Sequence, residues 1–286
     1  MEAILIHGGA GAIAQEREAE VELGLRLALD AAVSALQRGG DALAIAIAAV
    51  YALERNPSFN AGIGACLNLD GHIEHDACVM FGPDRSAGAV AGVSRLSSPV
   101  LAADEVRRSP HVLMAGKGAE RFAAERGLEL VEPESFVTER QLRSWQHYLA
   151  TKEGSRSGTV GAVVCDAAGQ VAAATSTGGM VGKLPGRIGD TPLVGAGTYA
   201  TPWAACSATG YGEYFIRTLA ARSAVDSCRS GRVQEAAEQA VGEVAQLGGE
   251  GGLILISSAG ELAWHCNSAN LAWAYWTPLA SAVGVR

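Results

Sequence analysis

The first part of the chain shows one apolar strand pattern followed by two helix patterns. Residues 3–7 form a short apolar run that ends at two glycines, at positions 8 and 9, and we predict a buried strand leading into a glycine loop. Residues 16–38 carry apolar side chains every three or four positions, which indicates a helix with one buried face. Asp41 then caps a predicted helix over 42–54. Because this helix is apolar on nearly every face, we expect it to be buried on more than one side.

Strand patterns dominate the next part of the chain. The predicted strands cover residues 66–69, 73–80 and 88–93, with a hairpin turn at 68–71. Helix patterns follow at residues 99–106 and 114–126. Residues 127–158 are charged and polar, and they predict a short helix followed by an exposed linker that ends near Gly154–Ser157.

The strand pattern returns abruptly at Thr159. Residues 159–166 and 171–177 predict two strands that pair as a hairpin. The remaining predicted elements are a strand at 204–208, helices at 212–222 and 233–247, and strands at 252–257 and 262–266. This order lacks the strict strand–helix alternation of a doubly wound fold, so we expect two antiparallel sheets sandwiched between helix layers.

The composition is that of one acidic domain with a sizeable core. The chain has 286 residues, of which 49% are hydrophobic, and a formal net charge of −8 without clusters of lysine and arginine. We therefore expect no binding to nucleic acid or to anionic membranes. The N-terminus lacks the pattern of a secretory signal and no apolar run is long enough to span a membrane, which predicts a cytoplasmic protein.

Cysteine and histidine are scattered along the chain. The six cysteines form no CxxC pair, and the six histidines have no spacing typical of a zinc site. We therefore expect reduced, buried cysteines and no metal site built from these side chains.

Residues 157–190 concentrate the chemistry of the chain. A Gly158–Thr159 junction separates the polar linker from a buried strand, a hydroxyl cluster at 175–177 ends the partner strand, and Arg187 lies three positions before Asp190. Each feature by itself has an ordinary interpretation. Thr159 is a good strand former, a strand can end in hydroxyl residues, and Arg187 and Asp190 can form a surface ion pair.

A series of short motifs runs along the chain outside about residues 128–157. They are HGGAGAI (7–13), NAGIGA (60–65), HDACVM (75–80), GTVGAV (158–163), ATSTGGM (174–180), KLPGRIGD (183–190), PLVGAGTYA (192–200), SATGYGEYFIR (207–217) and GGEGGLI (248–254). In this order they resemble the plant-type asparaginase and isoaspartyl aminopeptidase family of N-terminal-nucleophile hydrolases. The resemblance implies an α+β fold, the four-layer αββα sandwich of these hydrolases. It also implies a single domain, 1–286, that cleaves itself into an α subunit, 1–158, and a β subunit, 159–286.

The resemblance implies that Thr159 is the nucleophile released by cleavage of the bond between Gly158 and Thr159. A threonine hydroxyl is a weak nucleophile that needs a base. An N-terminal threonine supplies this base through its own α-amino group, whose reference pKa is about 7.7–8.0. In the family, Thr177 helps to position the nucleophile, and Thr209 and Gly210 donate hydrogen bonds to the oxyanion from a hydroxyl and a backbone N–H.

The resemblance also assigns the substrate-binding residues. Arg187 corresponds to the group that grips the substrate α-carboxylate, where a guanidinium can bind with two hydrogen bonds. Asp190 corresponds to the acceptor of the α-ammonium group, and Gly212 lies beside the substrate. This arrangement selects an aspartyl unit with both α-groups free, so the bond to be cut is an amide of the β-carboxyl. Tyr211, between two glycines, is a candidate for shaping the leaving-group preference.

Segment 53–63 resembles the sodium-binding loop of the family, in which backbone carbonyls coordinate the ion. The matching residues are Leu53, Glu54, Asn56, Phe59, Ala61 and Ile63. Because backbone carbonyls would coordinate the ion, the side chains say little about whether the sodium site exists, and an ordinary turn is the alternative. We expect a hydrogen-bonding role for Asn60 in this loop and a structural role for His7.

The resemblance implies a threonine amidohydrolase that cleaves isoaspartyl dipeptides and L-asparagine through a β-aspartyl ester, with no cofactor in catalysis. It further implies a homodimer of cleaved α/β units. One alternative is a glycosylasparaginase, which has the same nucleophile and a glycosylated substrate. The other is an unprocessed, inactive homologue with a binding role.

Overall fold

Two β-sheets pack face to face in the computed structural model, which describes residues 1–154 and 158–285. The large sheet contains, in spatial order, β12 (Ser281–Val285), β11 (Asn270–Trp276), β1 (Ala3–Gly11), β5 (Val160–Cys165), β6 (Val171–Thr177), β2 (His75–Phe81), β3 (Ala87–Val93) and β4 (Leu113–Ala115). The small sheet contains β10 (Leu262–Cys266), β9 (Gly251–Ser257), β8 (Ala204–Gly210) and β7 (Thr198–Thr201). Neighbouring strands are antiparallel except β3 and β4, which are parallel.

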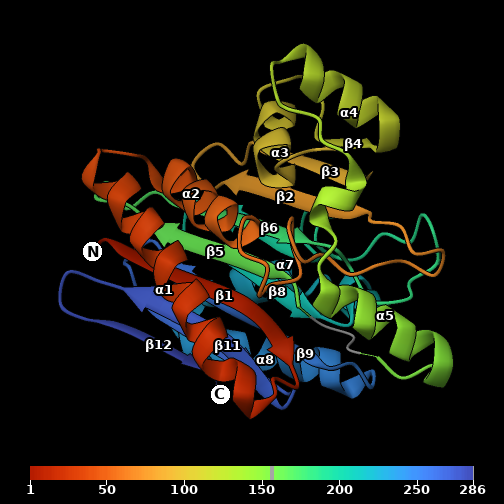
Figure 1. The fold of residues 1–286 in the computed structure, drawn as a ribbon. Helices are drawn as coiled ribbons and strands as arrows, with labels where there is room; N and C mark the ends of the chain where they lie inside the picture. Colours follow the sequence, from red (N-terminus) through yellow and green to blue (C-terminus); the bar gives the residue numbers. More distant parts are fainter. Residues whose placement is uncertain (155–157, 286) are drawn as a thin grey trace.

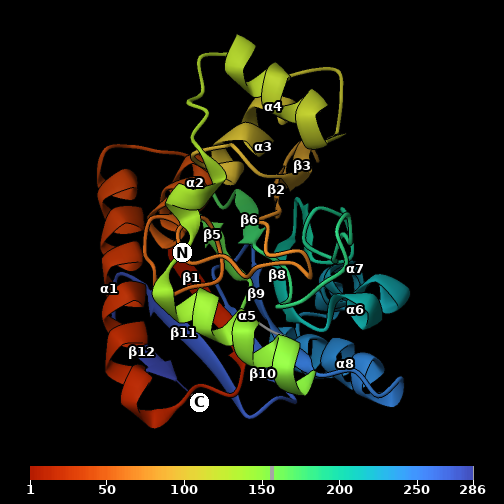
Figure 2. The same cartoon turned by 45° about the vertical axis from the view of Figure 1, so that its right-hand side comes forward.

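Helices cover the outer face of each sheet. The helices are α1 (Gln15–Gln37), α2 (Ala42–Glu54), α3 (Pro99–Arg107), α4 (Gly116–Glu125), α5 (Glu139–Thr151), α6 (Gly212–Thr218), α7 (Ala220–Ser227) and α8 (Val233–Gln246), with short 3-10 turns η1 (Pro133–Phe136) and η2 (Cys228–Ser230). In Figure 2 the layers follow one another from α1 on the left, through the two sheets, to α8 on the right. The expected αββα sandwich is confirmed.

Three apolar cores hold these layers together. The largest lies between the large sheet and helices α1 to α4, and it includes most of α2 (Figure 1). A second core fills the space between the two sheets, and a third joins the small sheet to α7 and α8. Alanine, valine and glycine supply much of this packing, so the layers approach closely. As expected, α2 is buried on several sides and Asp41 caps it, accepting a 2.8 Å hydrogen bond from the N–H of Ala44.

The first strand is longer than its apolar run predicts. β1 continues through the glycines to Gly11, with an irregular register between His7 and Gly9. The backbone of this segment pairs with β11, and a Cβ at Gly8 would lie 2.6 Å from the ring of Phe59. The glycines therefore serve close packing inside the strand, and the prediction of a loop from position 8 was wrong.

Two other predicted elements differ from the structure. Residues 66–69 form no strand, and a single bridge joins Leu67 to Ile73 across the predicted turn. The helix predicted over 212–222 is divided into α6 and α7 because Leu219 adopts a left-handed conformation, with φ of 50°. Strands β4, β7, β11 and β12 were not predicted, and β4 includes the first two residues of the helix predicted over 114–126. The linker predicted to end near Gly154–Ser157 lies, at 155–157, outside the described residues.

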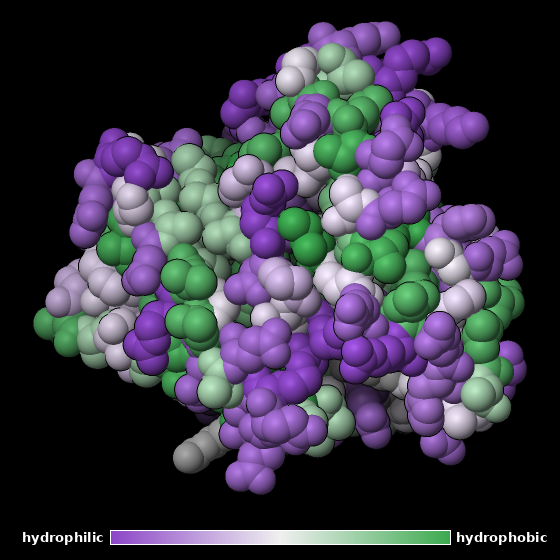
Figure 3. Space-filling model, in the orientation of Figure 1, coloured by the Kyte–Doolittle hydropathy of each residue, from purple (hydrophilic) through white to green (hydrophobic). Residues whose placement is uncertain are grey.

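The outer surface is a mixture of hydrophilic and hydrophobic side chains. In the view of Figure 3, hydrophilic residues gather around α4 and along α5, and hydrophobic groups lie between them. Helix α5 buries Gln141 and exposes most of its other side chains, which agrees with its polar sequence. Across residues 1–154 and 158–285, none of the helices has both the length and the hydropathy that crossing a bilayer requires.

The cysteines behave as expected in the residues described. All six are free thiols, and five of them are buried. Those same residues contain no cluster of three or more His, Cys, Asp and Glu side chains that could hold a metal ion.

Candidate active site

Thr159 lies at the open end of the β5–β6 hairpin, in the interior of the large sheet. Val160 pairs with Ser176, so the next pair outward in this register is Thr159 and Thr177. The Oγ1 of Thr159 donates a 3.1 Å hydrogen bond to the Oγ1 of Thr177, which also accepts a 2.9 Å hydrogen bond from the N–H of Gly179. The hairpin therefore brings the two threonines together, and both are buried.

The residue before Thr159 is packed so tightly that only glycine fits. Gly158 has a φ of +138°, which few residues other than glycine adopt, and a Cβ there would lie 2.8 Å from the Cβ of Asn60. On the other side, a Cβ at Gly9 would lie 2.8 Å from the Cα of Gly158. The side chain of Asn60 is fixed by hydrogen bonds to two backbone groups, at 2.6 and 2.7 Å, which agrees with its expected role.

Thr209 and Gly210 lie at the end of β8 in the small sheet and meet the glycine-rich end of β1. The fully buried hydroxyl of Thr209 accepts a 3.2 Å hydrogen bond from the N–H of Ala10. Because this bond uses a lone pair, the hydroxyl hydrogen of Thr209 remains available for donation. A Cβ at Gly210 would lie 2.5 Å from the carbonyl oxygen of Glu250, so the backbone approaches closely here.

Arg187, Asp190 and Gly212 converge on one point. A Cβ at Gly212 would lie 2.8 Å from Oδ1 of Asp190 and 2.9 Å from Nη2 of Arg187. Asp190 is 4% exposed, and its Oδ2 has no hydrogen-bond partner among the residues described. Burial raises the pKa of Asp190 to about 7, although its own backbone N–H and the charge of Arg187 favour the ionised form. Oδ2 of Asp190 is therefore suited to accept a hydrogen bond from a cationic donor.

The ordinary interpretation of Arg187 and Asp190 as a surface ion pair is wrong. Arg187 instead donates hydrogen bonds to the carboxylate of Glu213 from Nε, at 2.9 Å, and from Nη2, at 2.7 Å. The hydrogen bonds from Arg187 hold the pKa of Glu213 below its usual range. Glu213 was not expected from the sequence, although it directly follows Gly212 in the SATGYGEYFIR motif.

Two further buried charges near the site were not expected either. Asp76 pairs with Thr177 across β2 and β6, and its carboxylate accepts a 2.9 Å hydrogen bond from the N–H of Gly92. Lys183 is 3% exposed and donates from Nζ to the carbonyl oxygen of Glu74 at 2.8 Å. Burial raises the pKa of Asp76 and lowers that of Lys183. Both residues stand in motifs that carry the family resemblance. Lys183 ties the segment after Thr177 to the residue before β2, and Asp76 also accepts a 3.5 Å hydrogen bond from the N–H of Gly189 in that segment.

His7 is structural, as expected. Its Nε2 lies 2.8 Å from the hydroxyl of Ser207, which in turn lies 2.8 Å from the hydroxyl of Thr175. Burial lowers the pKa of His7 to about 3, so the ring is neutral at physiological pH. These buried hydroxyls join the two sheets beneath β5, which begins directly after Thr159, and Gly161 leaves the room for them.

Segment 53–63 forms a closed loop between α2 and the site. The N–H of Ile63 donates to the carbonyl oxygen of Glu54 at 2.8 Å, and Asn60 accepts at its carbonyl from the N–H of Gly178 at 3.0 Å. The carbonyl oxygens of Leu53, Glu54 and Asn56 each accept a backbone hydrogen bond within the loop, from Asn56, Ile63 and Phe59. Each keeps a second lone pair, and oxygen atoms are the ligands that hard cations prefer.

The side-chain carboxylate of Glu54 forms its hydrogen bonds outside segment 53–63. It accepts hydrogen bonds from the hydroxyl of Ser98 at 2.5 Å, the N–H of Val100 at 2.9 Å and the hydroxyl of Ser176 at 2.6 Å. Burial raises the pKa of Glu54 to about 7, against these hydrogen bonds. Glu54 therefore ties α2 and α3 to the residue that precedes Thr177.

Comparisons with known proteins identify the family to which the chain belongs. A family model described as Asparaginase matches residues 1–283. The chain is 48% identical to an isoaspartyl peptidase of Escherichia coli, over 95% of the chain and 92% of that protein. It is 46% identical to an isoaspartyl peptidase of Salmonella typhimurium, over 95% of both proteins. It is also 41% identical to an isoaspartyl peptidase/L-asparaginase of Rattus norvegicus, over 95% of the chain and 85% of that protein.

Proposed function

Since the chain belongs to the asparaginase family, we propose that it is a self-processing threonine amidohydrolase that cleaves β-aspartyl amide bonds in isoaspartyl dipeptides and L-asparagine. The observation that carries the proposal is the buried hydrogen bond from Thr159 to Thr177, directly after the tightly packed Gly158. It orients a hydroxyl beside the one peptide bond that such an enzyme must break to mature.

The first reaction converts the chain into two subunits. The hydroxyl of Thr159 attacks the carbonyl carbon of Gly158, and the bond to the Thr159 nitrogen breaks as the acyl group moves to oxygen. Water then hydrolyses the ester, which releases the Gly158 carboxylate and the Thr159 α-amine. The close packing of Gly9 and Asn60 around Gly158 supports this step, because it holds the reacting carbonyl in one position.

The second reaction uses the new N-terminus. The α-amine of Thr159 accepts the hydroxyl proton as the oxygen attacks the β-carbonyl of the substrate. The hydroxyl of Thr209 and the N–H of Gly210 stabilise the oxyanion. Ammonia or an amino acid then leaves with that proton, and water hydrolyses the β-aspartyl ester to free the enzyme.

Two charged groups bind the aspartyl unit. Asp190 accepts from the α-ammonium group through the Oδ2 that lacks a partner. Arg187 binds the α-carboxylate through the N–H groups of its guanidinium that Glu213 does not use, since Glu213 occupies Nε and one hydrogen of Nη2. Gly212 leaves the space in which the two groups meet the substrate.

The proposal is tested by purification and mass measurement followed by assays. Two pieces corresponding to 1–158 and 159–286 are expected for the wild type, with release of aspartate from asparagine and from β-aspartyl dipeptides. Thr159→Ala should remain one chain and hydrolyse neither, while Thr159→Ser, which keeps a hydroxyl, should be processed more slowly. A Thr159→Ala protein that still divides or hydrolyses these substrates would overturn the proposal. Glycosylated asparagine in the same assay distinguishes a glycosylasparaginase.

We also propose that the carbonyls of Leu53, Glu54, Asn56, Phe59, Ala61 and Ile63 hold a structural sodium ion. The ion would neutralise the carbonyl dipoles of the loop and hold it against Gly178. We expect a higher unfolding temperature in sodium chloride than in an equal concentration of choline chloride. Equal unfolding temperatures would refute the site. The homodimer of processed units and the cytoplasmic location stay predictions.

A further inference from the structure

We propose that a cavity of about 520 Å³ beside Thr209 and Gly210 receives the leaving residue of a β-aspartyl dipeptide, and that Glu250 makes it favour a basic leaving residue. The inference rests on the proposed function and names the class of dipeptide that this site prefers. The volume lies within the range of about 300–1,000 Å³ that is typical of small-ligand pockets.

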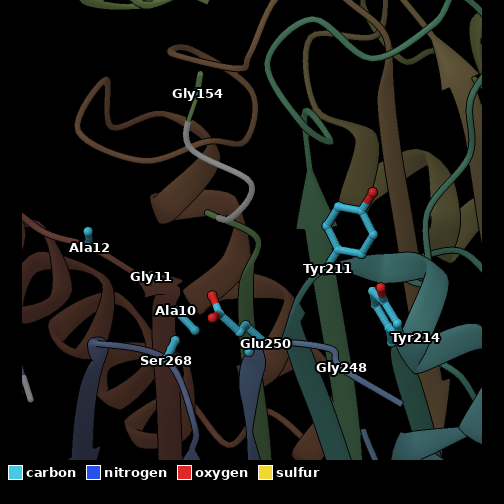
Figure 4. A pocket seen from close by; sticks show the side chains of 10 residues that line it. Ala10, Gly11, Ala12, Gly154, Tyr211, Tyr214, Gly248, Glu250 and Ser268 are labelled. Carbon is cyan, nitrogen blue, oxygen red and sulfur yellow. The ribbon is translucent and has the colours of Figure 1, made fainter. Parts of the chain in front are cut away.

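The cavity has an aromatic wall and an acidic wall. Figure 4 shows the rings of Tyr211 and Tyr214 on one side and the carboxylate of Glu250, beside Ala10 and Ser268, on the other. The two rings lie 5.1 Å apart between centroids. The other lining residues are small or glycine, so a long side chain has room between the walls.

The backbone that builds the oxyanion donors also builds the floor of this cavity. The N–H of Tyr211 donates to the carbonyl oxygen of Glu250 at 2.9 Å, directly after Gly210. On the opposite side, the N–H of Ala10, which lines the cavity, donates to the hydroxyl of Thr209. A carbonyl whose oxygen lies between Thr209 and Gly210 is therefore next to the residues that line the cavity.

The charge of the cavity favours a cation. Among the lining residues that the structure describes, Glu250 is the one with a charged side chain, and its exposed carboxylate makes no hydrogen bond or ion pair with the described chain. The ring of Tyr214 already faces a cation, because the guanidinium of Arg217 lies 5.7 Å from its centroid. The attraction for a basic leaving residue therefore rests on the carboxylate of Glu250. An acidic leaving residue would instead meet the repulsion of Glu250.

The size of the preference follows from the exposure of Glu250. The residue is exposed, so its attraction for a lysine side chain is screened by water. Exposed ion pairs of this kind change an equilibrium by about two- to fivefold. We therefore expect kcat/KM to fall from β-aspartyl-lysine to β-aspartyl-leucine and again to β-aspartyl-glutamate, by about threefold at each step.

The test compares these three dipeptides and asparagine in the wild type, Glu250→Gln and Glu250→Lys. Asparagine releases ammonia, which does not fill the cavity, so each dipeptide value is divided by the asparagine value of the same protein. Glu250→Gln should lower the lysine-to-glutamate ratio to about one, and Glu250→Lys should invert it. The backbone bond from Tyr211 to Glu250 is independent of the side chain, so folding and processing should persist. Glu125→Gln is the matched control, because Glu125 is exposed on α4, which packs on α3, β3 and β4.

Two results would overturn the subsite. One is a wild type without preference for the basic dipeptide. The other is a Glu250→Lys protein whose normalised ratios equal those of the wild type. If either result occurs while asparagine is hydrolysed normally, the subsite alone is refuted. If the processed wild type hydrolyses neither asparagine nor any dipeptide, the proposed function is refuted.

Discussion

Lowering the pH below about 7 is expected to weaken substrate capture through Asp190. Burial raises the pKa of this carboxyl from 3.8 to about 7, so above pH 7 it is ionised in the free enzyme and below pH 7 it holds a proton. A protonated carboxyl does not attract the α-ammonium group of the substrate. We therefore expect kcat/KM for asparagine to fall, below about pH 7, by up to tenfold per pH unit.

The magnitude of the effect follows from the same shift in the pKa of Asp190. A pKa moved from 3.8 to about 7 corresponds, at about 1.4 kcal/mol per pKa unit, to about 4 kcal/mol of cost for ionising Asp190 in its buried position. The substrate ammonium offsets this cost when it binds Oδ2. Asp190→Asn removes the ionic partner, and breaking a buried pair costs about 3–5 kcal/mol. We therefore expect the variant to lose at least about a hundredfold in kcat/KM.

The assay must separate Asp190 from the α-amine of Thr159, which has a reference pKa of about 7.7–8.0. Succinamic acid, which is asparagine without its α-ammonium group, should show the Thr159 titration but lack the additional fall due to Asp190. Identical pH profiles for the two substrates would refute the reasoning.

Stability measurements supply the control for Asp190. A carboxyl with a raised pKa in the folded state destabilises the fold as the pH rises from about 3.8 to about 7. Asp190→Asn cannot ionise, so it should be at least as stable as the wild type at pH 8. A variant that keeps wild-type kcat/KM at that pH would show that Asp190 does not bind the ammonium group.

Two further predictions concern the support of the site. The pKa of Glu54 is raised from 4.5 to about 7, so the fold should lose stability as the pH rises across this window, by up to about 3 kcal/mol. The urea midpoint of Glu54→Gln should not fall over this pH range. An equal fall in the wild type and in the variant would contradict the assignment of this titration to Glu54. Gly161→Ala adds a Cβ that clashes with the hydroxyl of Ser207 and with His7, and overpacking of this kind costs about 1–3 kcal/mol. We expect Gly161→Ala to have a lower unfolding temperature and slower self-cleavage. An unchanged unfolding temperature would contradict the prediction, because it would show that the two sheets can relax around the methyl group.

Much of the local structure could be predicted from the sequence. The helix over 42–54 begins at Asp41 because an acidic cap and an apolar run are adjacent in the chain. The hairpin that begins after Thr159 is similarly local. The family motifs pointed to Thr177 as the neighbour of Thr159, and the observed register of the two strands places them side by side. The motifs that resemble the asparaginase family also pointed to Arg187, Asp190 and Gly212, which the structure brings together.

Other features depend on residues that are distant in the chain. The hydrogen bond between Ala10 and Thr209 joins residues 199 positions apart. Arg187 pairs with Glu213 in the first turn of α6, 26 positions along the chain, and not with the nearby Asp190. The left-handed Leu219 that divides α6 from α7 has no signal in the helical period.

The amino-acid sequence by itself indicated the family and predicted Thr159 as the nucleophile with Thr177 beside it, because these predictions rest on contiguous motifs. The tertiary structure decided how the charges and the leaving-group cavity are arranged. Asp190 has a high pKa because surrounding layers exclude water from it, and Glu250 faces Tyr211 and Tyr214 because β8 and β9 meet the end of β1. Burial and long-range packing arise only when the two sheets come together.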